Sequence, residues 1–202
     1  MPRRLPSRLL AVLLFLGVAG ALTAGCANDV SPAAKVGDVK VTNKQLDDEV
    51  DEWIHNPAAY DKSQLTGINP GTYPMRLVSV ILQQRIDLEL HDQEFKQLHL
   101  SLDDNDRAGA LAQLFQGDTA QAQQALSGFS KAYATRYVND ISKQFAVEAK
   151  LGQQGYLAWR NTAYAKAHID VNPRYGTWDA STQTVVPPKG PDPAPGGASV
   201  SS

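Results

Sequence analysis

The only cysteine of the 202-residue chain, Cys26, follows directly after the longest apolar run of the sequence. A single thiol has no partner for a disulfide, and no further metal-binding side chains stand near it in the sequence. Arginines open the chain, and residues 9–25 carry no charge. A basic start, an apolar middle and small residues before a cleavage point are the parts of an export signal. We therefore interpret residues 1–25 as a signal peptide, since a spanning helix needs about 20 apolar residues.

The residues just before Cys26 indicate what its sulfur is used for. The stretch TAGC, residues 23–26, resembles the cleavage box of bacterial lipoproteins, in which the cysteine becomes the lipidated first residue. It departs from that pattern at Thr23, where the family usually has Leu and this chain has Leu22 one position earlier. The resemblance implies a lipid anchor on Cys26 that holds the protein on the extracytoplasmic face of the cell membrane. The alternative is a plain secretory signal cleaved elsewhere, with Cys26 present by chance.

No other group of residues has the spacing of a catalytic or metal-binding site. His91 and His99 stand two helical turns apart, not at the i, i+4 spacing of a zinc helix. The acidic run 47–52 is typical of a solvated helix face, and the acids of 103–106 lack the glycine and closing glutamate of a calcium loop. The sequence holds no phosphate-binding loop, dinucleotide fingerprint or nucleophile elbow. We therefore expect no enzyme activity, no metal and no cofactor.

Charge and composition define one domain and argue against nucleic acid as a partner. The whole chain has a net charge of −2, and removal of three signal-peptide arginines makes the remainder more acidic, whereas nucleic acid requires a basic face. The segment 187–202 is rich in Pro, Gly and Ser and has almost nothing to bury. We expect a linker over 26–34, one folded domain over 35–186, and a disordered tail over 187–202.

Hydrophobic periodicity predicts a mainly helical domain with a strand near each end. Valines around a Gly-Asp pair indicate a hairpin over 36–41, and Thr42 with Gln45 fits a capping box that opens the first helix. Ser101 with Asp104 resembles a second box. Periodic apolar positions then predict helices over 46–56, 73–98, 107–115, 119–126, 130–154 and 156–166, with Gly155 as the break, and a strand over 167–171. Because a two-stranded unit is marginal alone, we expect the two terminal strands to pair with each other and the helices to pack behind this pair.

Aromatic residues gather in the second half of the domain. They are Phe115, Phe129, Tyr133, Tyr137, Phe145, Tyr156, Trp159 and Tyr164. One interpretation is that most of them fill the core. The other is that some line a concave surface that binds extended chains, for which Tyr is suited because its ring is apolar and its tip polar.

The two ends of the domain together resemble the SurA-type periplasmic chaperones. The stretch AKVGDVKVTNKQLDDEVDEW, residues 34–53, is similar to the strand, turn and first helix of that family, apart from Asp38 after the glycine. Residues 77–107 are similar to the family's next helix and the joint after it, with His99 in place of the usual Gly. AHIDVNPRYGTWD, residues 167–179, is similar to the end of SurA-like actinobacterial lipoproteins. The parvulin isomerase domain of those proteins has no room here, since only Gly155 separates two helices.

The resemblance implies a helical SurA N-terminal, trigger-factor-like peptide-binding domain whose last strand pairs with the first. It implies a membrane-anchored extracytoplasmic chaperone that binds unfolded or extended segments of exported proteins without isomerase activity. We expect the binding cradle to lie between the long helices and to be lined by Val78, Leu82, Ile86, Tyr133 and Tyr137. The alternative is a structural lipoprotein that docks one specific partner in the cell envelope.

Overall fold

The structure, a computed structural model, describes residues 31–56 and 74–189. The expected signal peptide, Cys26 and all but the first residues of the expected tail lie outside this part of the chain. The described elements are β1 (Ala34–Val36), β2 (Val39–Val41), α1 (Asn43–His55), α2 (Met75–Gln97), α3 (Asp104–Leu114), α4 (Thr119–Ser127), α5 (Lys131–Lys166), β3 (Ile169–Val171), β4 (Thr177–Asp179) and β5 (Thr184–Val186). The predicted mainly helical class is confirmed.

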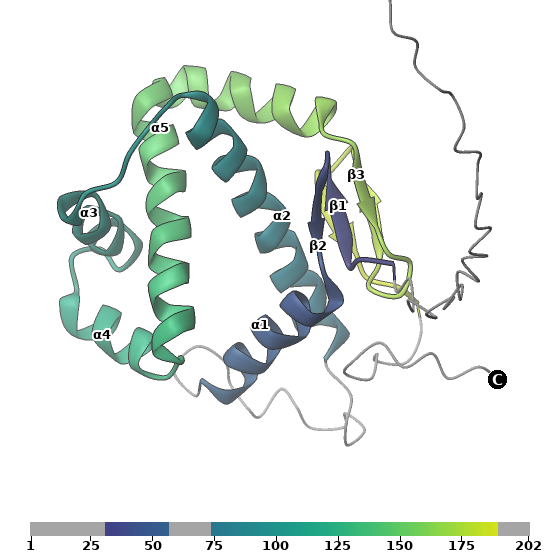
Figure 1. Cartoon of the computed structure of the whole chain (residues 1–202), viewed down its shortest axis with the longest axis horizontal. Coiled ribbons are helices and arrows are strands. Elements are labelled where there is room, and N and C mark those ends of the chain that lie inside the picture. The colour runs from purple at the N-terminus through teal and green to yellow at the C-terminus, as the bar shows by residue number, and fades with distance from the viewer. Residues whose placement is uncertain (1–30, 57–73, 190–202) are drawn as a thin grey trace, which may run out of the picture.

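The long helix α5 is bent and forms a frame around α2. The bend lies at Gly152, where a positive φ of 66° interrupts the helix. Figure 1 shows the first arm of α5 (residues 131–151) standing upright and the second arm (residues 153–166) crossing above α2 to reach the strands. In the same view α3 and α4 lie on the outer side of the first arm, opposite the strands. The predicted interruption was placed at Gly155, but only Gly152 has the left-handed backbone that favours glycine.

The expected pairing of the two ends of the domain is confirmed. β1 is the central strand of a three-stranded antiparallel sheet in the order β2-β1-β3, with Lys35 opposite Asp170. The amide of Asn172 donates to the carbonyl of Ala33 at 3.0 Å and extends the pairing beyond the strands. Gly37 makes the tight turn between β1 and β2 with a φ of 61°.

A second hairpin, β4 with β5, was not predicted. Its Trp178 stacks on Tyr164 with ring centroids 6.0 Å apart, and Gln83 of α2 accepts a hydrogen bond from the Val185 amide at 2.8 Å. Gly176 lies so close to this hairpin that an added Cβ would stand 2.4 Å from the carbonyl oxygen of Val186. The hairpin therefore closes over α2 and the second arm of α5.

Local hydrogen bonds fix where the first and third helices begin. The predicted capping box of Thr42 and Gln45 is present at α1, where the Gln45 amide donates to the Thr42 hydroxyl at 3.1 Å. At α3 the box consists of Asp103 and Asp106, so the predicted box of Ser101 and Asp104 is wrong by two residues. An aspartate accepts the same backbone N–H as a serine would, and its charge also suits the positive end of the helix dipole.

The main core lies between α1, α2 and the strands. It contains, among others, Val36, Leu46, Val50, Val78, Ile81, Leu82, Ile86, Val171 and Tyr175. The expectation that Val78, Leu82 and Ile86 line a solvent-open cradle is wrong, because each is at most 1% exposed. The reason is that α2 packs on α1, β1, β5 and α5 at once, so its apolar side is covered by the protein itself. Within the described residues, no helix has the length and apolar character needed to cross a membrane.

Candidate functional site

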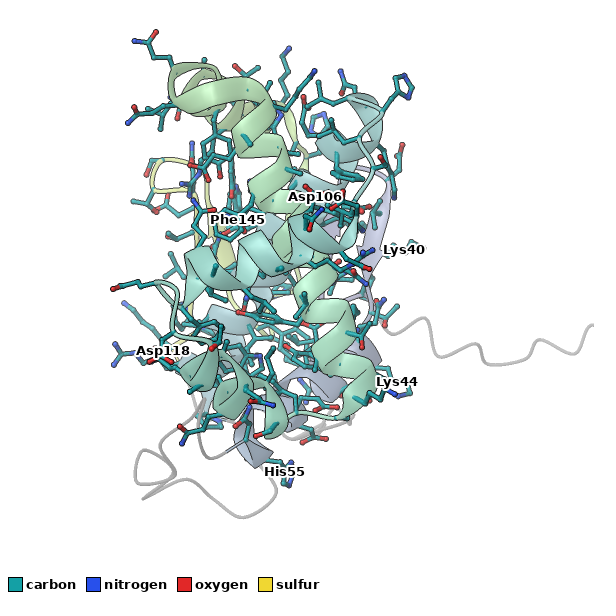
Figure 2. The ribbon with its side chains drawn as sticks, turned by 90° about the vertical axis from the view of Figure 1, so that its left-hand side faces the viewer. Lys40, Lys44, His55, Asp106, Asp118 and Phe145 are labelled. Atoms are coloured by element: carbon teal, nitrogen blue, oxygen red, sulfur yellow. The ribbon has the colours of Figure 1, made fainter. Side chains whose placement is uncertain are left out.

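An open hollow lies on the opposite side of the molecule from the strands, between the end of α1, the α3–α4 pair and the first arm of α5. Figure 2 looks onto this side, where α3 and α4 cover the first arm and Asp118 stands between them. The hollow has a volume of about 690 Å³. We call it the aromatic groove, and its lining is Trp53, Leu114, Phe115, Gln116, Asp118, Gln121, Ala125, Leu126, Phe129 and Tyr137.

Four aromatic rings line the aromatic groove, those of Trp53, Phe115, Phe129 and Tyr137, and the ring of Tyr133 packs behind them. Trp53, from the last turns of α1, meets the Phe129 ring edge-on at 5.5 Å between centroids. Its indole N–H donates to the Tyr133 hydroxyl at 2.7 Å. Tyr133 and Tyr137 follow one another on α5 and stack with centroids 6.1 Å apart, since residues four apart share a helix face. Burial raises the pKa of both tyrosine hydroxyls, which therefore stay neutral and serve as hydrogen-bonding tips.

The end of α1 is tied to the joint between α4 and α5. The Glu52 carboxylate accepts hydrogen bonds from the Ser130 amide, at 2.8 Å, and from the Ser130 hydroxyl. The fully buried Asn56 donates its side-chain amide to the Ala125 carbonyl at 2.8 Å. These bonds hold Trp53 and Phe129 together and so fix one wall of the aromatic groove.

This joint leaves no space for a side chain at Gly128. A Cβ added there would stand 2.1 Å from Oδ1 of Asn56, so we expect Gly128→Ala to lower the free energy of unfolding by about 1–3 kcal/mol. Urea unfolding of the chain measures this. Gly109→Ala in α3 is the matched control, because nothing lies within 4 Å of its added Cβ and Ala favours a helix interior, so stability should rise slightly. Equal effects of the two substitutions would contradict the described contact.

The other wall, formed by α3 and α4, packs thinly against the rest of the molecule. Ala110 and Ala122 are the buried residues of these two helices, and each has a small side chain. A cluster of Leu88, Ala110 and Ile141 joins α3 to α2 and α5. A further hollow of about 410 Å³ opens between α3 and α4, and Leu126 lines both it and the aromatic groove. Few buried apolar contacts predict low local stability for this pair of helices.

Ion pairs connect α2 with α1 and with the first arm of α5. Arg85 of α2 lies 3.1 Å from Asp140 of α5, 3.9 Å from Glu49 of α1 and 3.8 Å from Glu89. Arg136 of α5 lies 3.0 Å from Glu49. Burial raises the pKa of Glu49, while Arg136 and Arg85 act in the opposite direction. Part of the space in which an apolar cradle was expected, between the long helices, is therefore occupied by the protein's own charged side chains.

The residues predicted to bind peptide are thus divided by the fold. Tyr137 lines the aromatic groove, whereas Tyr133 stands behind it at 8% exposure and borders a neighbouring hollow. Trp53 and Leu114 were not predicted as groove residues, and Phe115 was named only among the aromatic residues of the second half of the domain. The sequence did contain a signal for Leu114 and Phe115. These two adjacent apolar residues stand at the end of a short helix, just before Gly117, and adjacent positions of a helix do not share one face.

No described residues form a cluster of three or more His, Cys, Asp or Glu side chains able to hold a metal ion. Comparison of the chain with protein-family models, with curated proteins and with solved structures finds no match.

Proposed function

We propose that the protein is a membrane-anchored, extracytoplasmic chaperone-like protein. It binds unfolded or extended segments of exported proteins and has no isomerase activity. The observation that carries this proposal is the aromatic groove, an open hollow of about 690 Å³ that is lined by rings and leucines and lies away from the strands.

The chemistry of the aromatic groove suits segments of varied sequence. Its rings and aliphatic side chains offer apolar surface. Burial of such surface contributes about 25 cal/mol per Å² and does not require the bound chain to adopt one fixed geometry. Gln116, Asp118 and Gln121 at the edge offer polar atoms to the backbone of an extended chain. Binding of this kind is weak per contact, requires no ATP, and tolerates many side chains.

The thin packing of α3 and α4 supports the same proposal. A wall that buries little more than Ala110 and Ala122 can shift at low cost and adapt its spacing to clients of different size. The opposite wall is fixed by Glu52 and Asn56. One fixed and one adaptable wall is an arrangement that favours promiscuous binding over recognition of a single ligand.

The test of this function is whether the full chain slows the aggregation of several unrelated unfolded proteins. We expect Leu114→Glu to weaken this activity roughly tenfold, since it places a charge on a groove residue that is 39% exposed and carries little of the fold. Leu157→Glu is the matched control, because Leu157 is 54% exposed and lies on the second arm of α5, outside the groove lining. Aggregation and thermal unfolding are measured for both variants.

Two outcomes would count against a general chaperone. Equal loss of activity in both variants would show that the aromatic groove is not the binding surface. Protection of one partner only, or of none, would favour the alternative of a lipoprotein that docks a specific component of the envelope.

The anchoring part of the proposal is tested at Cys26. Ala34 stands eight positions after it, so the domain would stand at most about 29 Å from the lipid. We expect Cys26→Ser to abolish incorporation of labelled palmitate and to move the protein from the membrane fraction to the soluble fraction. Cleavage and release of the unaltered chain without label would instead support a plain secretory signal.

A further inference from the structure

A second cavity lies inside the bend of α5 and is separate from the aromatic groove. It has a volume of about 310 Å³ and lies between α2 and the second arm of α5. Two rows of polar residues, each spaced by four, face one another across it. Gln83, Asp87 and His91 come from α2, and Tyr156, Arg160 and Tyr164 come from α5. The aliphatic part of the lining is Val80, Leu88 and Ile141.

Hydrogen bonds within and between the two rows stand at both ends of the cavity. At one end, Gln83 donates to Oδ1 of Asp87 at 2.9 Å, and the Tyr164 hydroxyl donates to the same oxygen. At the other end, Nδ1 of His91 stands 2.6 Å from the Asp87 carbonyl oxygen and must carry the proton, so Nε2 accepts from the Tyr156 hydroxyl at 2.9 Å. Burial lowers the pKa of His91, which keeps this ring neutral. These bonds hold the cavity in shape.

Two groups of opposite charge in the cavity lack a complete set of partners. Nε of Arg160, the middle member of its row, is buried and has no hydrogen-bond partner. In the part of the chain that the structure describes, both hydrogen bonds to the Asp87 carboxylate go to Oδ1 and none goes to Oδ2. A buried polar atom without a partner is uncommon in a folded protein and calls for an explanation.

We propose that this cavity binds a small zwitterion with an aliphatic side chain, the chemistry of a free aliphatic α-amino acid. The ligand carboxylate accepts from Arg160, the ligand ammonium donates to Oδ2 of Asp87, and the side chain packs on Val80, Leu88 and Ile141. A ligand with one charge would meet only one of these two groups, whereas a zwitterion offers an acceptor to Arg160 and a donor to Oδ2 of Asp87 at once. The volume stands at the small end of the range for ligand pockets and suits a molecule of this size.

Calorimetric titration of the full chain with L-leucine tests the proposal. The comparison ligands are 4-methylpentanoate, which lacks the ammonium, and 3-methylbutylamine, which lacks the carboxylate. We expect leucine to bind at least about tenfold more tightly than either, since each charge-assisted hydrogen bond contributes about that factor. Failure of leucine to bind the folded chain at millimolar concentration would overturn the proposal.

Two variants separate the roles of the charged groups. Arg160→Gln should lower leucine affinity about tenfold and remove the preference for leucine over 3-methylbutylamine. Asp87→Asn should lower leucine affinity similarly and remove the preference over 4-methylpentanoate. Leucine affinity that is unchanged in both variants would contradict the assignment of these groups.

A rim variant keeps the test valid if Arg160 or Asp87 is needed for folding. Val80 lines the cavity but is 58% exposed, so Val80→Trp should close the entrance and abolish leucine binding without lowering the thermal midpoint. Leu157→Trp, at a site equally exposed but outside the cavity, is the matched control and should bind leucine normally. Normal leucine binding by Val80→Trp would show that the ligand sits elsewhere.

Discussion

Replacing Leu82 with alanine is expected to lower the free energy of unfolding by about 2–5 kcal/mol. Leu82 is fully buried in the middle of α2, within the core that also contains Leu46 and Val78. Removing its methyl groups loses their transfer free energy and leaves a cavity that α1 and the strands cannot fill completely. Urea unfolding followed by circular dichroism measures the change.

The control for this prediction is the same substitution at an exposed site. Leu157→Ala should change stability by no more than about 0.5 kcal/mol, because Leu157 is 54% exposed. The comparison also tests the location of the client site. If Leu82→Ala left stability unchanged but reduced protection of unfolded proteins, Leu82 would line a binding surface and its described burial would be contradicted.

Replacing Arg85 with methionine is expected to lower the free energy of unfolding by about 3–5 kcal/mol at neutral pH. Methionine keeps the apolar stem, but Glu49, Glu89 and Asp140 lose the guanidinium group that lies within 3.9 Å of all three. Breaking a buried ion pair by removing one partner is costly because the remaining charges stay buried. Lys44→Met is the matched control and should cost at most about 1 kcal/mol, since its pair with Asp48 is exposed.

The cost of Arg85→Met should depend on pH in a defined direction. Burial holds the pKa of Glu49 above its ordinary value of 4.5, and Arg85 opposes that shift. A carboxyl group whose pKa is raised by folding stabilises the folded state when it is protonated. Its contribution to the free energy of unfolding is therefore complete below pH 4.5 and is lost as pH rises through the pKa that Glu49 has in the folded state. The difference between wild type and Arg85→Met should therefore be small near pH 4 and grow toward pH 7. A difference that is constant over this range would contradict the charge-based explanation.

The pairing of the two ends, which places Lys35 opposite Asp170, was expected from the resemblance and because two strands are marginal alone. Local patterns in the sequence were sufficient to predict the helical class, the capping box at Thr42 and the strand near the start of the domain. Each of these depends on neighbouring residues or on strongly alternating valines, as in 36–41. The apolar pattern of residues 73–98 correctly predicted the helix α2. It could not indicate which neighbours cover each side, and so Val78, Leu82 and Ile86 were assigned to a cradle when they belong to the core.

Features that depend on distant segments were missed for a physical reason. Arg85 and Asp140 meet because the bend at Gly152 brings the first arm of α5 alongside α2, and no local pattern encodes that approach. The β4–β5 hairpin is held by the stacking of Trp178 on Tyr164 of α5 and by the hydrogen bond from the Val185 amide to Gln83 of α2, which lies 102 positions earlier in the sequence. The aromatic groove likewise combines residues from α1, α3, α4 and α5. Of its lining residues, Tyr137 alone was among those expected to bind peptide.

The central position of β1 in its sheet sets an order of events during synthesis. β1 is among the first described segments to be made, but its partner β3 follows more than a hundred residues later, on the order of ten seconds at typical translation rates. Until then one edge of β1 has no partner, and Ala34 and Val36 lack their cover from Val171 and Ile169. A chain released early keeps this edge open to proteases and to other strands, so closure of the sheet distinguishes complete molecules from truncated ones.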